Sequence, residues 1–126
     1  MAYRNILLID DDLEDQEIFV SALRSISKEI TCTVIGDPIK ALARLSDRES
    51  TPDMIFLDLN MPLMSGQDFL KKIKELDFLR EIPVIIFSTS SYAPTLDITK
   101  KLGASGFITK PGKFDELIQI LKRLIN

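Results

Sequence analysis

The chain has 126 residues and a formal net charge of -3, so it fits one globular domain of ordinary size. It contains no histidine, which excludes a Ser-His-Asp triad, a histidine metal site and a phosphohistidine within this chain. Its single cysteine, Cys32, excludes an internal disulfide and a cysteine-based zinc site. We expect Cys32 to be a small core residue in a reducing compartment.

The charge pattern and the apolar runs exclude two classes of partner. No run of Lys and Arg forms a basic patch, so direct binding to nucleic acid is not expected. No signal peptide opens the chain, and no apolar run approaches the length of a membrane span. The sequence therefore predicts a cytoplasmic protein with no membrane contact.

Five short apolar runs predict β-strands. In chain order they are Ile6–Ile9, Cys32–Ile35, Met54–Leu57, Val84–Phe87 and Gly106–Ile108. The first, third and fourth are almost continuously apolar, which is typical of central parallel strands covered on both faces. The second alternates apolar and polar residues, which favours a strand at the edge of the sheet.

Segments of helical period follow the strands. In chain order the predicted helices are Leu13–Lys28, Pro38–Leu45, a helix from Ser65 through Leu76, Ala93–Leu102 and a final helix from Phe114 to Ile125. Asp12, Asp37 and Ser65 stand where N-caps belong. The fourth helix is the most weakly anchored, with Leu96 and Leu102 as its main apolar residues.

This alternation of strands and helices predicts an α/β fold. The expected architecture is a flavodoxin-like (βα)5 doubly wound sheet of five parallel strands in the order 2-1-3-4-5. We expect residues 1–126 to form a single domain with no output domain. In this order the first and third strands are neighbours, and the functional site is expected at the carboxyl ends of the strands there.

Charged and hydroxyl residues follow the predicted strands where each strand ends. The first strand is followed by Asp10 and Asp11, the third by Asp58, the fourth by Ser88 and the fifth by Lys110. Parallel strands bring these ends to one edge of the sheet. Carboxylates without histidine or cysteine favour Mg²⁺ or Mn²⁺ over zinc or copper, so the acids predict a site for one of these two hard cations.

The remaining groups predict phosphoryl chemistry. Asp58 is the expected nucleophile, because a carboxylate can form an aspartyl-phosphate. We expect Lys110 to pair with Asp58 at rest and later with a phosphate oxygen, while the Ser88 hydroxyl donates to another. Further hydroxyl residues follow Ser88, so this assignment can shift by one position. Asp53 precedes the third strand, roughly 16 Å from Asp58, and is expected at the opposite edge of the sheet with no part in the site.

Together these motifs resemble the receiver domains of two-component response regulators over essentially the whole chain. The matching stretches are Asp10-Asp11, Asp58-Leu-Asn-Met-Pro62, Ser65-Gly66, Ser88 and Gly103-Ala-Ser-Gly-Phe-Ile-Thr-Lys-Pro111. In its proportions the chain is similar to the stand-alone receivers that work with phytochrome-type or hybrid kinases.

The resemblance implies a role for each acid. Asp58 would accept a phosphoryl group from the phosphohistidine of a sensor histidine kinase or phosphotransfer protein. Mg²⁺ would be held by Asp11, Asp58 and the backbone carbonyl of Asn60, with Asp10 acting partly through water. The protein would then be no enzyme toward other substrates, catalysing only its own phosphotransfer and dephosphorylation.

The resemblance also implies a switch. Ser88 and Phe107 match the family's switch pair, in which the hydroxyl moves to the phosphate and the aromatic ring turns inward. The resemblance is compatible with a cis bond between Lys110 and Pro111, but the sequence alone does not show which isomer is present. The fourth helix, the fifth strand and the last helix would form the face that binds a downstream protein, or a second copy of this chain in a homodimer.

Two other functions stay open at this point. A pseudo-receiver would share the fold and bind partners without being phosphorylated, but such modules usually lack part of the site. A Mg²⁺-dependent phosphatase of the haloacid dehalogenase type would use an Asp-x-Asp motif after the first strand, which Asp10 and Asp12 match formally. The Asp58 stretch and the short chain disfavour the phosphatase.

Overall fold

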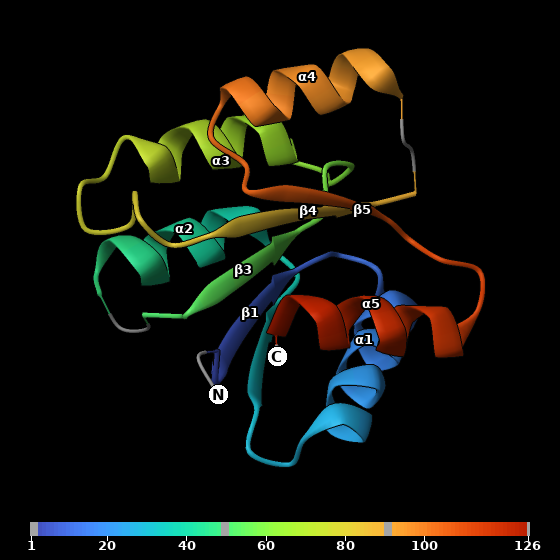
Figure 1. The fold of residues 1–126 in the computed structure, drawn as a ribbon. Coiled ribbons are helices and arrows are strands. Elements are labelled where there is room, and N and C mark those ends of the chain that lie inside the picture. Colours follow the sequence, from blue (N-terminus) through green and yellow to red (C-terminus); the bar gives the residue numbers. More distant parts are fainter. Residues whose placement is uncertain (1–2, 49–50, 90–91, 126) are drawn as a thin grey trace.

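The computed structural model describes residues 3–48, 51–89 and 92–125 and has five strands that alternate with five helices (Figure 1). The strands are β1 Asn5–Ile9, β2 Thr31–Ile35, β3 Met54–Leu57, β4 Val84–Ser88 and β5 Gly106–Thr109. The helices are α1 Leu13–Ile26, α2 Pro38–Ser46, α3 Gly66–Lys74, α4 Ala93–Lys101 and α5 Phe114–Ile125. Every predicted element is present, and the strand bounds differ from prediction by one residue at most.

The strands form one parallel sheet in the order β2-β1-β3-β4-β5, as predicted. β1 lies between β2 and β3, so Ile9 is paired with Ile35 on one side and Leu57 on the other. β3 is completely buried, whereas β2 at the edge is only partly buried. This confirms that the continuous apolar runs are central strands.

Alternate residues of each strand pack on opposite faces of the sheet, because side chains along a strand point alternately to either side. Leu8 and Phe56 belong to the core under α1 and α5, and Leu7 and Ile55 belong to the core under α2 and α3. Figure 1 shows α1 and α5 on one face, and α2, α3 and α4 on the other. Burial of each such side chain stabilises the fold by about 1.5–3 kcal/mol.

Side-chain caps begin the first three helices where the sequence predicts them. The carboxylates of Asp12 and Asp37 accept hydrogen bonds from helix backbone N–H groups at 3.0 and 2.9 Å. The Ser65 hydroxyl accepts one at 3.2 Å. Two helices end two residues earlier than predicted: α1 ends at Ile26, because Ser27 is extended, and α3 ends at Lys74.

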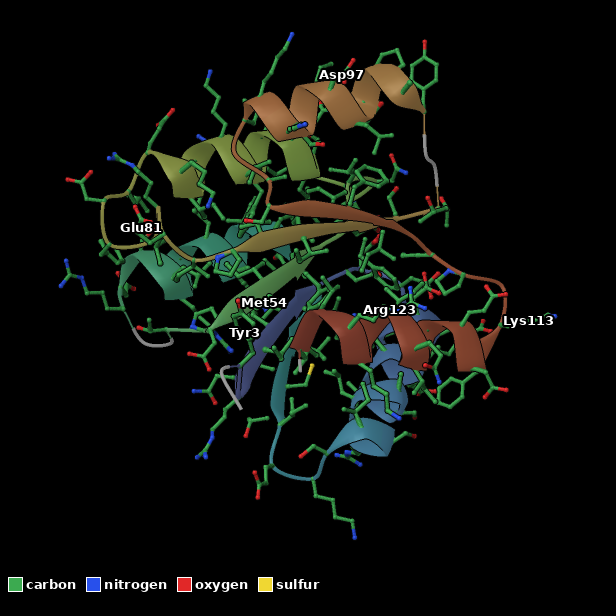
Figure 2. The ribbon with its side chains drawn as sticks, viewed as in Figure 1. Tyr3, Met54, Glu81, Asp97, Lys113 and Arg123 are labelled. Carbon is green, nitrogen blue, oxygen red and sulfur yellow. The ribbon has the colours of Figure 1, made fainter. Side chains whose placement is uncertain are left out.

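α4 is the helix least buried in the described part of the chain. Thr99 is its single buried residue, and the side chain of its N-cap residue, Tyr92, makes no capping hydrogen bond. Asp97 lies on its outer side, away from the sheet (Figure 2). The prediction that this helix is weakly anchored is therefore confirmed.

Two smaller points concern Cys32 and Pro111. Cys32 is partly buried in β2 against the core under α1 and α5, and burial raises the pKa of its thiol to about 12, as suits a small core residue. The bond before Pro111, which the sequence left open, is trans, because none of the described peptide bonds is cis. No helix within the described residues has the length and apolar character needed to cross a membrane.

Candidate functional site

Three carboxylates meet at the carboxyl ends of β1 and β3. Asp10 and Asp11 follow β1, and Asp58 follows β3. The backbone N–H of Asp58 donates to the carbonyl of Ile9 at 2.9 Å. Since β1 and β3 are paired neighbours, these residues leave the sheet side by side. One oxygen from each carboxylate lies within 4.8 Å of the others. Asp10 and Asp58 are buried and Asp11 is exposed, so the cluster opens to solvent on one side.

Lys110 brings a positive charge to this cluster from the end of β5. Its backbone N–H donates to the carbonyl of Ser88 at 2.7 Å, which continues the pairing of β4 with β5. Its ammonium donates to Asp15 at 2.7 Å and to Asp10 at 2.9 Å, and lies 3.8 Å from Asp58. The expected pairing with Asp58 exists, but it is the longest of the three ion pairs.

Asp15 is the site residue that the sequence interpretation missed. It lies in the first turn of α1, three residues after the N-cap Asp12, and its carboxylate lies beside Lys110. The position of Asp15 in the sequence could have indicated its role. A helix that begins directly after β1 places its first turn over the edge of the sheet where Asp10 and Asp11 lie.

Burial makes the ionised cluster costly. It raises the pKa of Asp58 to about 6, with the charges of Asp10 and Asp11 adding to the effect and Lys110 opposing it. Burial also raises the pKa of Asp10, against the opposing hydrogen bonds from the Asp12 N–H and from Lys110. Burial acts to lower the pKa of Lys110, but its hydrogen bonds to Asp15 and Asp10 outweigh this and the pKa is raised. A divalent cation beside the acids would reduce the repulsion between the ionised carboxylates of Asp10, Asp11 and Asp58.

The loop after β3 is held against Asp58 by a glycine. A Cβ atom on Gly66 would lie 2.4 Å from the Asp58 carbonyl oxygen and 2.7 Å from the Cα of Leu59, closer than such atoms can approach. The Gly66 N–H donates to the Leu59 carbonyl at 3.0 Å, and the Asn60 N–H lies 3.4 Å from an Asp58 carboxylate oxygen. Within this loop Leu63 has a φ of 71°, an unfavourable value for a residue with a side chain.

Ser88 ends β4 and is fully buried. It lines a pocket of about 320 Å³ together with residues of the β3–α3 loop and of the start of α4. Asn60 is among these lining residues, so the predicted hydroxyl lies beside the loop that carries the predicted metal-binding carbonyl. Of the hydroxyl residues after it, Ser90 and Ser91 lie outside the described residues.

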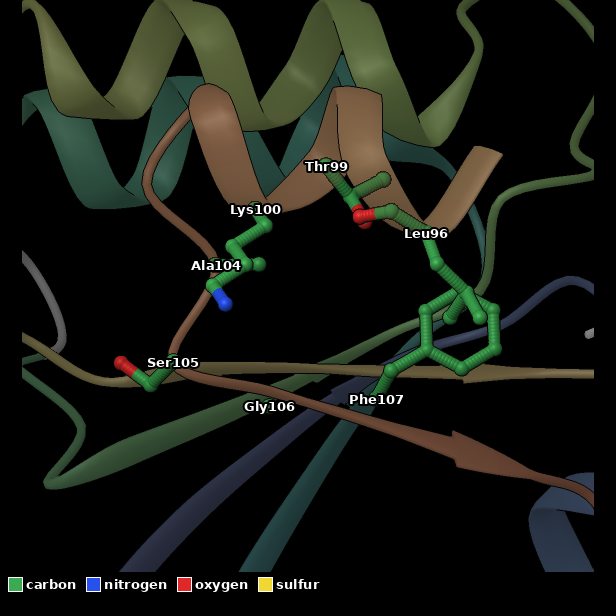
Figure 3. Close-up of a pocket in the computed structure, with 7 residues that line it drawn as sticks. All are labelled: Leu96, Thr99, Lys100, Ala104, Ser105, Gly106 and Phe107. Carbon is green, nitrogen blue, oxygen red and sulfur yellow. The ribbon is translucent and has the colours of Figure 1, made fainter. Parts of the chain in front are cut away.

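Phe107 lies on the face of β5 that points toward α4. Its ring lies beside Leu96 and lines a pocket of about 250 Å³ between β5 and α4, with Lys100 and Ser105 at the other end (Figure 3). Phe107 is only partly buried and is paired in register with Ile86 of β4. The ring of the predicted switch pair therefore borders open space under the most weakly anchored helix.

Asp53 lies at the opposite edge of the sheet, as predicted. Its carboxylate accepts hydrogen bonds from the backbone N–H groups of Arg4 and Asn5, at 2.9 and 2.8 Å, at the start of β1. This acid satisfies backbone donors where β1 begins and is separate from the cluster where β1 ends.

Comparison with known proteins decides the family. The family model of the response regulator receiver domain matches residues 6–122. The chain belongs to the response regulator receiver domain family. This receiver is 34% identical over 130 residues to the two-component response regulator ARR7 of Arabidopsis thaliana, a match that covers 96% of the receiver and 62% of ARR7. The receiver thus spans somewhat less than two thirds of the length of that relative.

Solved structures agree with the receiver fold. The phosphorylated cyanobacterial phytochrome response regulator RcpA has a TM-score of 0.88 and 30% identity, with 98% of this receiver and 91% of that chain covered. The Mn²⁺-bound form of response regulator Rcp1 has a TM-score of 0.85 and 25% identity, with 96% and 91% covered. The receiver is therefore a two-component signalling domain with a flavodoxin-like fold.

Proposed function

We propose that Asp58 accepts a phosphoryl group from the phosphohistidine of a sensor histidine kinase or phosphotransfer protein. The observation that carries this proposal is the position of Asp58, which has a carboxylate oxygen of each of two further acids within 4.8 Å and the Lys110 ammonium 3.8 Å away. In the transfer, an Asp58 carboxylate oxygen bonds to phosphorus, the phosphorus–nitrogen bond breaks, and the imidazole nitrogen keeps the electron pair.

Mg²⁺ is the proposed cofactor, with Mn²⁺ as a substitute. The cluster supplies only carboxylate oxygens, which suits these hard cations, and the Mn²⁺-bound state of the similar Rcp1 supports a divalent site. Asp11, Asp58 and the backbone carbonyl of Asn60 would hold the ion. Both Asp10 oxygens already accept hydrogen bonds, from the Asp12 N–H and from Lys110, so Asp10 acts through water. The bound ion would supply charge neutralisation for the phosphoryl group.

Lys110 and Ser88 are the proposed partners of the transferred group. The Lys110 ammonium donates to one phosphoryl oxygen, since it already lies near the Asp58 carboxylate. The Ser88 hydroxyl donates to another, from the end of the neighbouring strand. Such fixed donors stabilise the charge on the phosphoryl oxygens, which is most of what phosphoryl transfer requires of a protein.

The proposed output is a changed surface over α4, β5 and α5. Phosphorylation adds about -1.5 to -2 of charge at Asp58. Movement of Ser88 toward that charge would open space for Phe107, whose ring borders the pocket beneath α4. The surface would then bind a downstream protein or a second copy of this chain. The similarity to RcpA supports a phytochrome-type kinase as partner, acting in the cytoplasm.

Phosphorylation with a small donor tests the proposal. The protein is incubated with Mg²⁺ and acetyl phosphate, and the modified residue is located by mass spectrometry. We expect the phosphoryl group on Asp58, none on Asp58→Asn, and an unchanged yield for Asp53→Asn, which alters an acid at the opposite edge. Absence of any phosphoryl group would favour the pseudo-receiver. Modification of Asp10 with rapid turnover of phosphate esters would favour the phosphatase.

Hydrogen exchange tests the output separately. Amide protection in α4 is compared with and without beryllofluoride, which mimics the phosphoryl group. We expect protection in α4 to change, because this helix has a single buried residue in the described structure. Unchanged exchange in α4 and β5, with beryllofluoride bound at Asp58, would contradict the proposed output surface.

A further inference from the structure

The shortest contact of the Lys110 ammonium is with Asp15, a residue that has no role in the proposed function. Its hydrogen bond to Asp15 is 2.7 Å long, its hydrogen bond to Asp10 is 2.9 Å, and its distance to Asp58 is 3.8 Å. The side chains of Lys110 and Asp15 are 11% and 32% exposed, so the contact between them is partly shielded from water. A shielded charge-assisted hydrogen bond is stronger and more directional than a surface ion pair.

Asp15 is fixed by its own helix and does not depend on the acid cluster for its position. The Asp15 backbone N–H donates to the N-cap carboxylate of Asp12 at 3.0 Å, which locks the first turn of α1. The carboxylate of Asp15 is about one third exposed and reaches from that turn to Lys110. α1 in turn is anchored to the sheet by the fully buried Phe19, whose ring packs against Phe56 at 4.9 Å between centroids.

An ammonium group has three N–H bonds arranged tetrahedrally around the remaining bond to carbon. If Asp10 alone accepted one of them, the Cε–Nζ bond could still swing about the axis of that hydrogen bond and carry the other two N–H groups with it. A second acceptor at Asp15 removes this freedom, and the direction of the third N–H is then determined. Asp58 is the third carboxylate near Lys110, so the remaining donor serves the Asp58 side of the site.

A ring closes the site beneath the ammonium. The nitrogen of Lys110 lies 5.4 Å from the centroid of the Phe87 ring, close enough for a favourable cation–π contact. Phe87 also packs against Phe19 of α1, with centroids 5.5 Å apart. The helix that carries Asp15 and the ring that supports Lys110 thus belong to one packed unit.

We propose that Asp15 is a positioning residue for phosphoryl transfer: it fixes the Lys110 ammonium so that its third N–H faces the phosphoryl group on Asp58. Asp15 touches neither phosphoryl group nor metal and acts through Lys110. The inference rests on the proposed role of Asp58, which it deepens by adding a residue from α1 to a site otherwise built at strand ends.

Three variants of the full chain separate hydrogen bonding from charge. Asp15→Ala removes both, Asp15→Asn keeps an acceptor oxygen without the charge, and Glu14→Ala removes an equal charge from the neighbouring exposed residue in the same turn. The rate of Asp58 phosphorylation by acetyl phosphate is measured at saturating Mg²⁺. We expect a decrease of about tenfold for Asp15→Ala and about two- to threefold for Asp15→Asn. For Glu14→Ala we expect less than about twofold.

A second measurement separates this inference from the proposed function. Heteronuclear NMR of the lysine ammonium groups reports the order of Lys110 in the unphosphorylated protein. We expect a protected Lys110 ammonium signal in the wild type and in Asp15→Asn, and its loss in Asp15→Ala, whether or not Asp58 accepts a phosphoryl group. A wild type that is never phosphorylated, with this pattern present, would refute the role of Asp58 while leaving the anchoring of Lys110 supported.

Two results would overturn the inference. One is an Asp15→Ala protein that folds, keeps the ordered ammonium signal and is phosphorylated at the wild-type rate. The other is an equal decrease for Asp15→Ala, Asp15→Asn and Glu14→Ala, which would assign the effect to negative charge in the first turn of α1 and not to the hydrogen bond. Unfolding midpoints of all variants establish that each is folded under the assay conditions.

Discussion

Replacement of Asp58 by asparagine is expected to stabilise the metal-free protein. The carboxyl group is buried, and its pKa is raised from the ordinary 3.8 to about 6, net of the opposing attraction of Lys110. The folded protein therefore pays to ionise a group that ionises freely in the unfolded chain. Asparagine keeps the shape and an acceptor oxygen for the Asn60 N–H, and it removes the charge.

The magnitude and the pH range follow from the two pKa values. Between about pH 4 and pH 6 the folded state holds the Asp58 proton that the unfolded state has released, so the free energy of unfolding falls as the pH rises. About two pKa units at about 1.4 kcal/mol each give about 3 kcal/mol. Asp58→Asn should be more stable by about this amount above pH 6, which raises the melting temperature by about 10 °C. Below about pH 4 the two proteins should be equally stable.

Urea unfolding of both proteins at several pH values, with chelator present, measures this difference. Addition of Mg²⁺ should then reverse the order, because the ion binds the folded wild type more tightly than the folded variant. The reasoning would be refuted by an Asp58→Asn protein no more stable than the wild type at pH 7.5. It would also be refuted by a gain of equal size at pH 4, since a gain without pH dependence cannot come from the Asp58 charge.

Three other substitutions test local features of the fold. Gly66→Ala should cost about 2–3 kcal/mol of unfolding free energy and slow phosphorylation, because the new Cβ would lie 2.4 Å from the Asp58 carbonyl oxygen. Lys74→Met should cost about 1–2 kcal/mol, because two loop carbonyl oxygens lose the ammonium that donates to each at 2.9 Å. Leu63→Gly should gain about 1 kcal/mol, because glycine adopts the φ of 71° without strain. Urea unfolding measures all three.

Each of these three substitutions has a matched control. Gly112→Ala adds a Cβ that meets no atom within 4 Å, so it should leave stability unchanged. Lys72→Met removes an exposed ammonium from the same helix as Lys74 and should have little effect. Leu63→Ala shortens the side chain but keeps the strained backbone, so it should bring no gain. A control that matches its test variant would contradict the corresponding argument.

The sheet could be predicted from sequence because its signals are local and strong. The runs around Ile6 and Ile55 are apolar at every position, and only strands covered on both faces bury such runs completely. The caps at Asp12 and Asp37 were equally local, since each side chain bonds to a backbone N–H two or three residues ahead. Helix ends were less certain because they depend on the backbone of the residues that follow, such as the extended Ser27.

The site could be predicted only in part. Parallel strands bring Asp10, Asp11 and Asp58 to one edge whatever the details of packing, so their proximity followed from the strand order. The partner of Lys110 did not follow, because the choice between Asp15 and Asp58 depends on where α1 lies over the edge of the sheet. That position is set by the tertiary packing of Phe19, which no local pattern specifies.

The site also depends on the order in which the chain is made. Its acids follow β1 and β3, but the ammonium that neutralises them follows β5, the last strand. On the ribosome, amino-terminal segments emerge and begin to fold first. A nascent chain that ends before residue 110 therefore contains the acids of the cluster without the ammonium that pairs with them. The site therefore has its full set of charged groups only after synthesis has passed β5.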